Sequence, residues 1–234
     1  MSNTKLSPGI VSSRLSKEDY LNNFSDAYPG FTNYEAKVEA DRCYFCYDAP
    51  CISACPTEIN IPLFIRQIST EMEDEAAKTI FDQNILGGMC ARVCPTETLC
   101  EEACVREAAE GKPVKIGRLQ RYATDSIMEK NIHPYTRNES NGKKIAVIGS
   151  GPAGLACSHR LAMLGYNVEI YESKNKPGGL NEYGIATYKS VDNFASKEIE
   201  WLLKIGGIQI NYNKTLGKDF SIDELRKSYD AIFI

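Results

Sequence analysis

Cysteine is concentrated in one part of this chain. Eight of the nine cysteines lie between residues 43 and 104, and they form two groups. The groups read Cys43-x2-Cys46-x4-Cys51-x3-Cys55-Pro56 and Cys90-x3-Cys94-x5-Cys100-x3-Cys104. A secreted disulfide scaffold would be a shorter chain with a signal peptide, whereas clustered thiols in a reducing compartment usually bind metal. The spacing therefore predicts a region that folds around metal centres.

Two kinds of metal centre use eight cysteines. In the ferredoxin run C-x2-C-x2-C-x3-C-P, three thiolates hold one iron–sulfur cluster and the fourth reaches another. The first group follows this pattern with a longer middle loop, and each group contains a Cys-Pro pair. Two zinc sites are the alternative, but zinc sites usually pair two CxxC motifs, and only Cys43 and Cys46 have that spacing. The pattern favours two [4Fe–4S] clusters over zinc.

The second group contains two pairs of cysteines four residues apart, Cys90 with Cys94 and Cys100 with Cys104. If each pair is helical, both of its thiols lie on one face of a helix. Not every cysteine of the group has to be a ligand. Cys90 follows two glycines and a methionine, and a buried cysteine also serves as a small hydrophobe.

The remaining candidate ligands are isolated in the sequence. Cys157 lies on an expected helix, where a core position is the simpler interpretation. His133 falls in an expected linker and His159 on the same helix as Cys157, and neither has a metal-ligand partner at a suitable spacing.

The two halves of the chain differ in character. Helices are expected at 17–23, 34–42, 61–68, 73–84 and 115–130, with the Gly-Gly pair at 87–88 ending the fourth of them. A polar linker with proline and glycine follows at 131–142. We therefore predict an α-helical iron–sulfur domain at 1–137.

Beyond the linker, strands and helices alternate. Strands are expected at 143–148, 167–171, 208–212 and 231–234, with helices at 152–164, 191–205 and 222–227. This alternation indicates a parallel α/β sheet. The second domain, at 143–234, is therefore expected to be Rossmann-like. The chain stops inside an apolar strand, so we expect an N-terminal, truncated portion of a longer protein.

A glycine loop joins the first of these strands to its helix. The residues Gly149, Ser150, Gly151, Pro152, Ala153 and Gly154 fit G-x-G-x-x-G. Such a loop lets the backbone approach a pyrophosphate, and the helix N-terminus favours the anion. Glu172 ends the next strand, at the position where an acidic side chain bonds a ribose hydroxyl. The loop therefore predicts dinucleotide binding.

A second glycine turn follows Glu172 at Pro177-Gly178-Gly179-Leu180. NAD-binding domains do not need this turn. The combination of the glycine loop, Glu172 and this Gly-Gly pair is similar to the FAD-binding domain of flavoproteins that bind two dinucleotides. The resemblance favours FAD as the cofactor, with Gly178, Gly179 and Leu180 at its site.

The cysteine groups, the segment IGRLQR at 116–121 and the glycine loop together resemble one family over nearly the whole chain. That family comprises the N-terminal region of dihydropyrimidine dehydrogenase, the PreT-type bacterial flavin subunit and the small subunit of NADPH-dependent glutamate synthase. Carried over by position, the resemblance implies one cluster on Cys43, Cys46, Cys51 and Cys104, and a second on Cys55, Cys94, Cys100 and Gln120. Cys90 is left out of both sets.

The resemblance also implies a reaction. FAD would accept a hydride from NAD(P)H and pass electrons singly through the clusters to a partner subunit or domain, with the catalytic subunit of dihydropyrimidine dehydrogenase as the favoured partner. A glutamate synthase small subunit, or a related NAD(P)H:acceptor oxidoreductase, is the second interpretation. A zinc-bound, non-catalytic assembly module is a third, of a different class.

The sequence departs from the family in two respects. The family usually has Gly-Ile-Pro and then Arg or Lys after the Gly-Gly pair, whereas this chain has Gly184-Ile185-Ala186 and then Lys189. The family's NAD(P)H-binding domain would lie after Ile234. The resemblance therefore implies that this polypeptide alone does not oxidise NAD(P)H.

Charge and hydropathy exclude some partners. Residues 1–142 carry 15 Lys and Arg against 21 Asp and Glu, so no basic stripe offers a surface to nucleic acid. No apolar run approaches the roughly 18 residues of a membrane span, and the start of the chain lacks the apolar segment of a secretory signal. A cytoplasmic location, without membrane or nucleic-acid partners, is expected.

Overall fold

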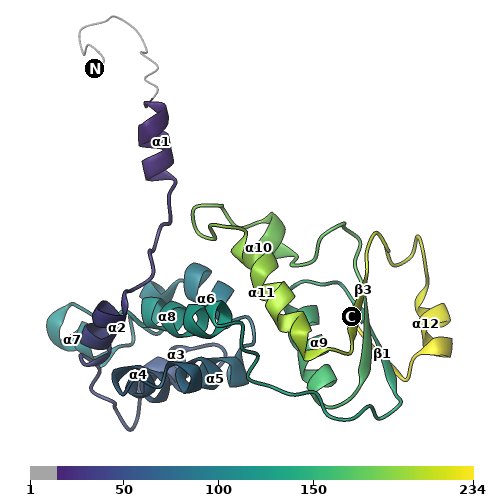
Figure 1. Ribbon diagram of the computed structural model, residues 1–234, viewed down its shortest axis with the longest axis horizontal. Coiled ribbons are helices and arrows are strands. Elements are labelled where there is room, and N and C mark those ends of the chain that lie inside the picture. Colours follow the sequence, from purple (N-terminus) through teal and green to yellow (C-terminus); the bar gives the residue numbers. More distant parts are fainter. Residues whose placement is uncertain (1–14) are drawn as a thin grey trace, which may run out of the picture.

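The computed structural model describes residues 15–234 (Figure 1). The first 14 residues of the predicted helical domain lie outside this range. The described chain has a helical half, residues 15–130, and an α/β half, residues 144–234, joined by residues 131–143. The helical half contains α1 (Lys17–Asn23), α2 (Asn33–Ala40), α3 (Pro50–Ala54), α4 (Ile61–Ser69), α5 (Glu73–Gln83), α6 (Gly87–Val93), α7 (Val105–Glu110) and α8 (Ile116–Glu129).

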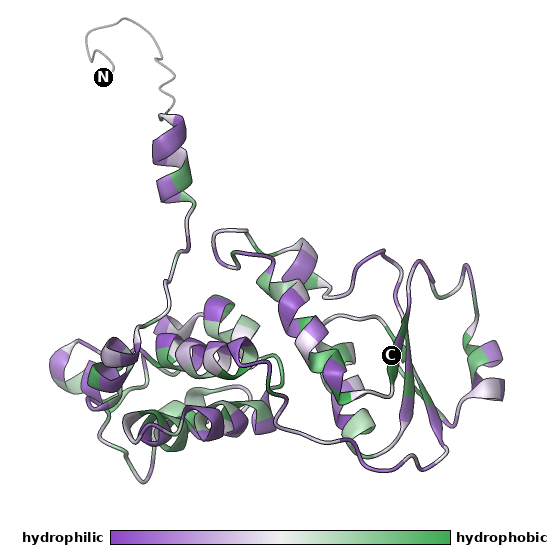
Figure 2. Ribbon diagram, in the orientation of Figure 1, coloured by the Kyte–Doolittle hydropathy of each residue, from purple (hydrophilic) through white to green (hydrophobic). Residues whose placement is uncertain are grey.

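Helix α4 illustrates how the helical half forms. The Asn60 side chain accepts a hydrogen bond from the Leu63 N–H and caps the helix, while Pro62 occupies its first turn. Apolar residues recur at helical spacing and are buried, at Ile61, Phe64, Ile65 and Ile68. Together with buried residues of α5 and α8 they form the core of this half, and Figure 2 shows the hydrophobic residues on the inward faces of these helices.

The α/β half contains β1 (Lys144–Ile148), α9 (Pro152–Met163), β2 (Asn167–Tyr171), α10 (Leu180–Tyr183), α11 (Phe194–Leu202), β3 (Ile208–Asn211), α12 (Ile222–Ser228) and β4 (Ala231–Phe233). The strands form one parallel sheet in the order β3-β2-β1-β4. Helices α9 and α12 lie on opposite sides of this sheet (Figure 1). The arrangement confirms a helical region followed by a Rossmann-like parallel sheet.

Most elements coincide with those expected from the pattern, but one assignment is wrong. Helix α5 ends at Gln83, and the Gly-Gly pair does not end it. Instead Gly87 and Gly88 begin α6, where both are buried. A Cβ on Gly87 would lie 2.6 Å from the Ile80 side chain, so this pair permits close packing of α6 on α5.

None of the helices in residues 15–234 is both long and apolar enough to cross a membrane.

Candidate functional site

The first predicted ligand set gathers around one cavity. Cys43 follows α2, Cys51 lies in α3, and Cys104 precedes α7. With Cys46, these residues line an apolar cavity closed by Ile61, Pro62, Ile65, Val114 and Ile116. Burial, and to a smaller extent the neighbouring cysteines, raises the pKa of the Cys51 thiol to about 12. Four such thiols become thiolates together only if a bound cation compensates their charge.

The second predicted set also comes together. The thiols of Cys55 and Cys100 lie close enough to Cys94 to oppose its ionisation. Cys100 in turn responds to Cys51 of the first set, so the two sets are neighbours. Gln120 enters from α8, and its Nε2 donates a hydrogen bond to the Gly87 carbonyl at 2.8 Å. Cys55, Cys94 and Cys100 therefore lie near one another, and Gln120 contacts the first turn of α6, the helix after which Cys94 stands.

Cys90, which the resemblance leaves out, lies within this second set. It is on α6, and the N–H of Cys94 bonds to its carbonyl at 2.9 Å. The Cys90 thiol, acting as a hydrogen-bond donor, lowers the pKa of Cys94, and its own pKa is raised by that bond and by burial. Cys90 also reaches the Gln120 side chain.

The expectation of two helical cysteine pairs is therefore half correct. Cys90 and Cys94 are one helical turn apart, at the middle and the end of α6. Cys100 and Cys104, in contrast, lie in consecutive turns between a short 3-10 helix at Thr96–Thr98 and α7. One hydrogen bond of the α-helical kind forms here, from the Ala103 N–H to the Leu99 carbonyl, but the chain does not continue as a helix.

The arrangement of side chains does not converge on a point. Within the part of the chain that the structure describes, no group of three or more His, Cys, Asp or Glu side chains is placed to hold a single metal ion. The first predicted set surrounds the apolar cavity instead. Four thiols lining one cavity suit the four-cysteine ligand set of a [4Fe–4S] cluster.

The glycine loop has the geometry that its sequence indicates. Gly149 has φ +91° and its N–H bonds to the Tyr171 carbonyl at 2.8 Å, which turns the chain sharply after β1. A Cβ on Gly154 would lie 2.0 Å from the Gly149 carbonyl oxygen, so α9 can pack here only with glycine. A Cβ on Gly151 would meet nothing within 4 Å, so this side of the loop is open. Pro152 and Ala153 form the first turn of α9, whose N-terminus is placed for an anion.

The Glu172 side chain is fixed in place by hydrogen bonds from the glycine loop. Its Oε2 accepts hydrogen bonds from the N–H of Ser150 at 2.9 Å and from Ser150 Oγ at 2.5 Å. Its Oε1 accepts one from the Lys174 N–H at 2.8 Å. Burial alone would raise the pKa of Glu172, but these donors together lower it. The side chain is therefore an ionised acceptor at neutral pH.

The second glycine turn packs directly on the first. The Gly178 N–H bonds to the Ser150 carbonyl at 2.8 Å, and a Cβ on Gly179 would lie 2.8 Å from the Gly151 Cα. Leu180 begins α10 and is exposed. The structure thus brings all ten predicted nucleotide-binding residues to the carboxyl end of β1 and β2.

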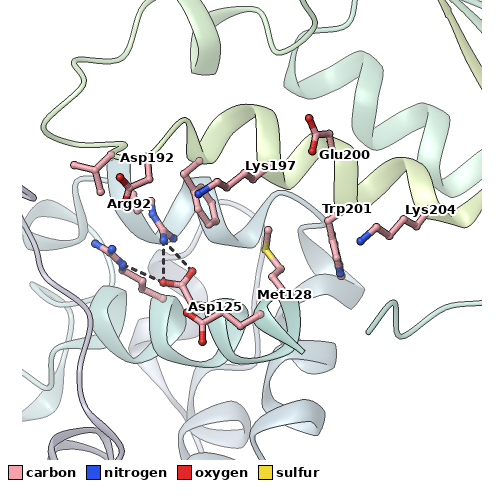
Figure 3. A pocket seen from close by; sticks show the side chains of 12 residues that line it. Arg92, Asp125, Met128, Asp192, Lys197, Glu200, Trp201 and Lys204 are labelled. Carbon is pink, nitrogen blue, oxygen red and sulfur yellow. Dashed lines mark hydrogen bonds and ion pairs between the residues drawn. The ribbon is translucent and has the colours of Figure 1, made fainter. Parts of the chain in front are cut away.

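A groove of about 440 Å³ lies between α8 and α11 (Figure 3). Arg92 NH2 donates to both oxygens of Asp125, at 2.9 and 2.8 Å. The Arg92 guanidinium carbon lies 3.3 Å from the centre of the Phe194 ring. Arg92 comes from α6, Asp125 from α8 and Phe194 from α11, so this contact joins the two halves of the chain.

Sequence patterns gave no signal for the most buried acidic residue. Glu198 on α11 is fully buried, and its Oε1 accepts hydrogen bonds from the N–H groups of Gly88 at 2.8 Å and Met89 at 3.0 Å. Burial raises its pKa to about 8, although these two donors and Arg92 act in the opposite direction. A glutamate at a core position of an amphipathic helix is the only sign of it in the sequence.

Comparison with known proteins is consistent with this geometry. Residues 20–132 match the family described as dihydropyrimidine dehydrogenase domain II, 4Fe-4S cluster, and residues 147–191 match the NAD(P)-binding Rossmann-like domain. The chain is 39% identical over 220 residues to an NAD-dependent dihydropyrimidine dehydrogenase subunit PreT homolog of Salmonella typhi, covering 94% of this chain and 52% of that protein.

Two further relatives come from Escherichia coli strain K12. The PreT subunit is 37% identical over 94% of this chain and 52% of its own length, and the glutamate synthase [NADPH] small chain is 34% identical over 90% and 44%. The chain therefore spans about half the length of these relatives. Along nearly all of its own length it is similar to the PreT-type subunits and the glutamate synthase small chain, and its residues 20–132 match the 4Fe-4S domain of dihydropyrimidine dehydrogenase.

Proposed function

We propose that this chain is the electron-input part of an NAD(P)H oxidoreductase that uses FAD and two [4Fe–4S] clusters. The observation that most supports this proposal is that two neighbouring sets of thiols and an open glycine loop occur in one chain whose halves pack together. Residues 1–137 would form the cluster domain and residues 143–234 the first part of the FAD domain.

In this proposal the chain's own residues set the positions of the cofactors. Cys43, Cys46, Cys51 and Cys104 would hold one cluster, and Cys55, Cys94, Cys100 and Gln120 the other. Clusters of this kind carry one electron at a time and have potentials set by ligand charge and exposure. An uncharged amide in place of a thiolate makes the second site less negative, which raises its potential relative to a site with four thiolates.

The nucleotide site has matching features. The open side of Gly151 and the N-terminus of α9 suit a pyrophosphate, and Glu172 suits a ribose hydroxyl. The flavin supplies the conversion of a two-electron hydride transfer into single electrons. Lys189 lines a cavity of about 390 Å³ together with Cys94 and Arg118, so one residue of the second ligand set shares a cavity with a residue of the α/β half.

The names of the relatives favour one partner. The PreT-type subunits belong to dihydropyrimidine dehydrogenases, so we propose a pyrimidine-reducing partner subunit or domain. The similarity to the glutamate synthase small chain supports a second candidate, a partner that makes glutamate. Tagged chain co-expressed with each kind of partner distinguishes them, because a stable complex forms with one and not the other.

The first test is anaerobic analysis of iron, acid-labile sulfide, zinc and flavin, followed by EPR after dithionite reduction. We expect about eight irons and eight sulfides per chain, with [4Fe–4S] signals. Zinc without iron or sulfide would overturn the proposal in favour of a non-catalytic module.

A further inference from the structure

The first turn of α6 is completed by the other half of the chain. The amides at the start of a helix have no partner within the helix. At the N-cap of α6 stands Leu86, whose apolar side chain cannot accept a hydrogen bond. The Gly88 and Met89 amides donate instead to Oε1 of Glu198, a residue 110 positions later than Gly88. A buried carboxyl group from α11 therefore acts as the helix cap.

Only a glycine fits at position 88 in this contact between α6 and α11. A Cβ on Gly88 would lie 2.7 Å from the Phe194 ring and 2.8 Å from Glu198 Oε1. Both of these side chains belong to α11. Helix α6 is thus seated against α11 through bare backbone, and its position is sensitive to that one carboxylate.

The same turn is tied to the second ligand set. Cys94 ends α6, and Gln120 bonds to the Gly87 carbonyl in its first turn. Arg92 also bonds to the Gly88 carbonyl at 3.1 Å. A shift of the first turn would therefore move both a thiol and an amide of the second set relative to the α/β half.

A contact needed only for packing would not require a polar group. Among the residues that the structure describes, Glu198 Oε2 has no hydrogen-bond partner. Burying a carboxylate with an unpartnered oxygen costs stability, which a well-packed apolar residue would avoid. The other oxygen, Oε1, accepts hydrogen bonds from two amides of α6. The role of the Glu198 side chain is therefore to orient the first turn of α6.

We propose that Glu198 is a positioning residue for the second cluster, holding the first turn of α6 against α11 and so fixing Cys94 and Gln120 relative to the nucleotide loop. This inference rests on the proposed function above.

The test compares E198A and E198Q with the parent in the cofactor-loaded chain. E198Q keeps an oxygen in place, whereas E198A removes both hydrogen bonds. We expect amide hydrogen exchange at Gly88 and Met89 to become about tenfold faster or more in E198A and to stay near the parent rate in E198Q. E200A, an exposed change on the same helix, is the matched control and should have no effect.

The second readout is electronic. We expect the EPR signal of the second cluster and the rate of electron transfer from photoreduced flavin to change in E198A, with iron and flavin content unchanged, and to be restored in E198Q. Faster exchange with an unaltered EPR signal and transfer rate would overturn the positioning role, as would E198Q behaving like E198A. Absence of iron in the parent would overturn the proposed function instead, while the exchange result still reports on the contact.

Discussion

The Nε2 atoms of His133 and His159 lie 3.3 Å apart where the linker crosses α9. His133 also stacks on Trp201, with ring centres 4.8 Å apart, and the Trp201 indole N–H bonds to the Ile132 carbonyl at 2.8 Å. A proton gained by either imidazole would place a positive charge next to the other ring. The pair therefore makes the junction between the halves sensitive to acid.

We predict that the His133–His159 pair lowers the stability of the chain as the pH falls from about 6.5 to about 4. Burial lowers the pKa of His159 to about 4, and the pKa of His133 is lowered as well. At these two sites the unfolded chain binds more protons than the folded chain in this window, so the stability that depends on them falls by about 3 kcal/mol. Glu198, whose raised pKa keeps it protonated in the folded chain, acts in the opposite direction. Urea unfolding followed by fluorescence of Trp201, the single tryptophan, measures it. H159F should remove the contribution of His159, so the unfolding free energy of H159F relative to the parent should rise as the pH falls, and a constant difference would contradict the prediction.

Gly88→Ala is predicted to destabilise the contact between the halves. The added methyl group would overlap Phe194 and Glu198, which costs about 1–3 kcal/mol because α11 has to move. Gly30→Ala is the matched control, since its Cβ would lie 3.8 Å from Arg121 Nε, an ordinary contact. Thermal unfolding of both variants decides, and equal melting temperatures would show that α11 is not seated on Gly88.

Substitutions at two glycines of the nucleotide loop should separate an effect on FAD binding from an effect on folding. Gly154→Ala should reduce both stability and FAD content, because its Cβ would lie 2.0 Å from the Gly149 carbonyl oxygen. Gly151→Ala should leave stability unchanged, since its Cβ meets no protein atom within 4 Å, but should weaken FAD binding by filling the open side. Flavin absorbance and urea midpoints measure the two effects. A Gly151→Ala variant with normal FAD affinity would show that the pyrophosphate lies elsewhere.

Cysteine substitutions should distinguish ligands from neighbours. Cys94→Ser is predicted to lower the iron content from about eight to about four per chain, because a ligand of one cluster is lost. Cys90→Ser should retain the iron and shift the EPR signal of the second cluster, since Cys90 donates a hydrogen bond to Cys94. Cys157→Ser serves as the control, as Cys157 lies on α9, outside both predicted sets. Loss of about four irons in Cys90→Ser would make Cys90 a ligand.

Local signals made much of this fold predictable. The strand, loop and helix from Lys144 to Met163 are encoded by adjacent residues, because an apolar run, glycines and a helical pattern follow one another directly. The first cysteine set lies around one cavity, and Cys55, Cys94 and Cys100 lie near one another, while their roles as ligands remain a proposal.

Other features depend on residues far apart in the chain. The Gly-Gly pair at 87–88 looks like a helix end, because glycine usually stands after a helix. It begins a helix here only because Glu198 caps it and α5 packs against it. The proximity of His133 and His159 likewise depends on the path of the linker, for which no periodicity exists. Contacts of this range leave no pattern in the sequence of either partner.

The capping of α6 by Glu198 has a consequence for biosynthesis. The chain emerges from the ribosome with its N-terminus first, so the cysteines of α6 are made long before the carboxylate that completes their helix. For the time needed to make 110 further residues, Cys90 and Cys94 lie in a segment whose first turn has no cap. Delivery of iron and sulfide to the second set in the cell is therefore expected to follow synthesis of the α/β half, and not the appearance of the thiols themselves.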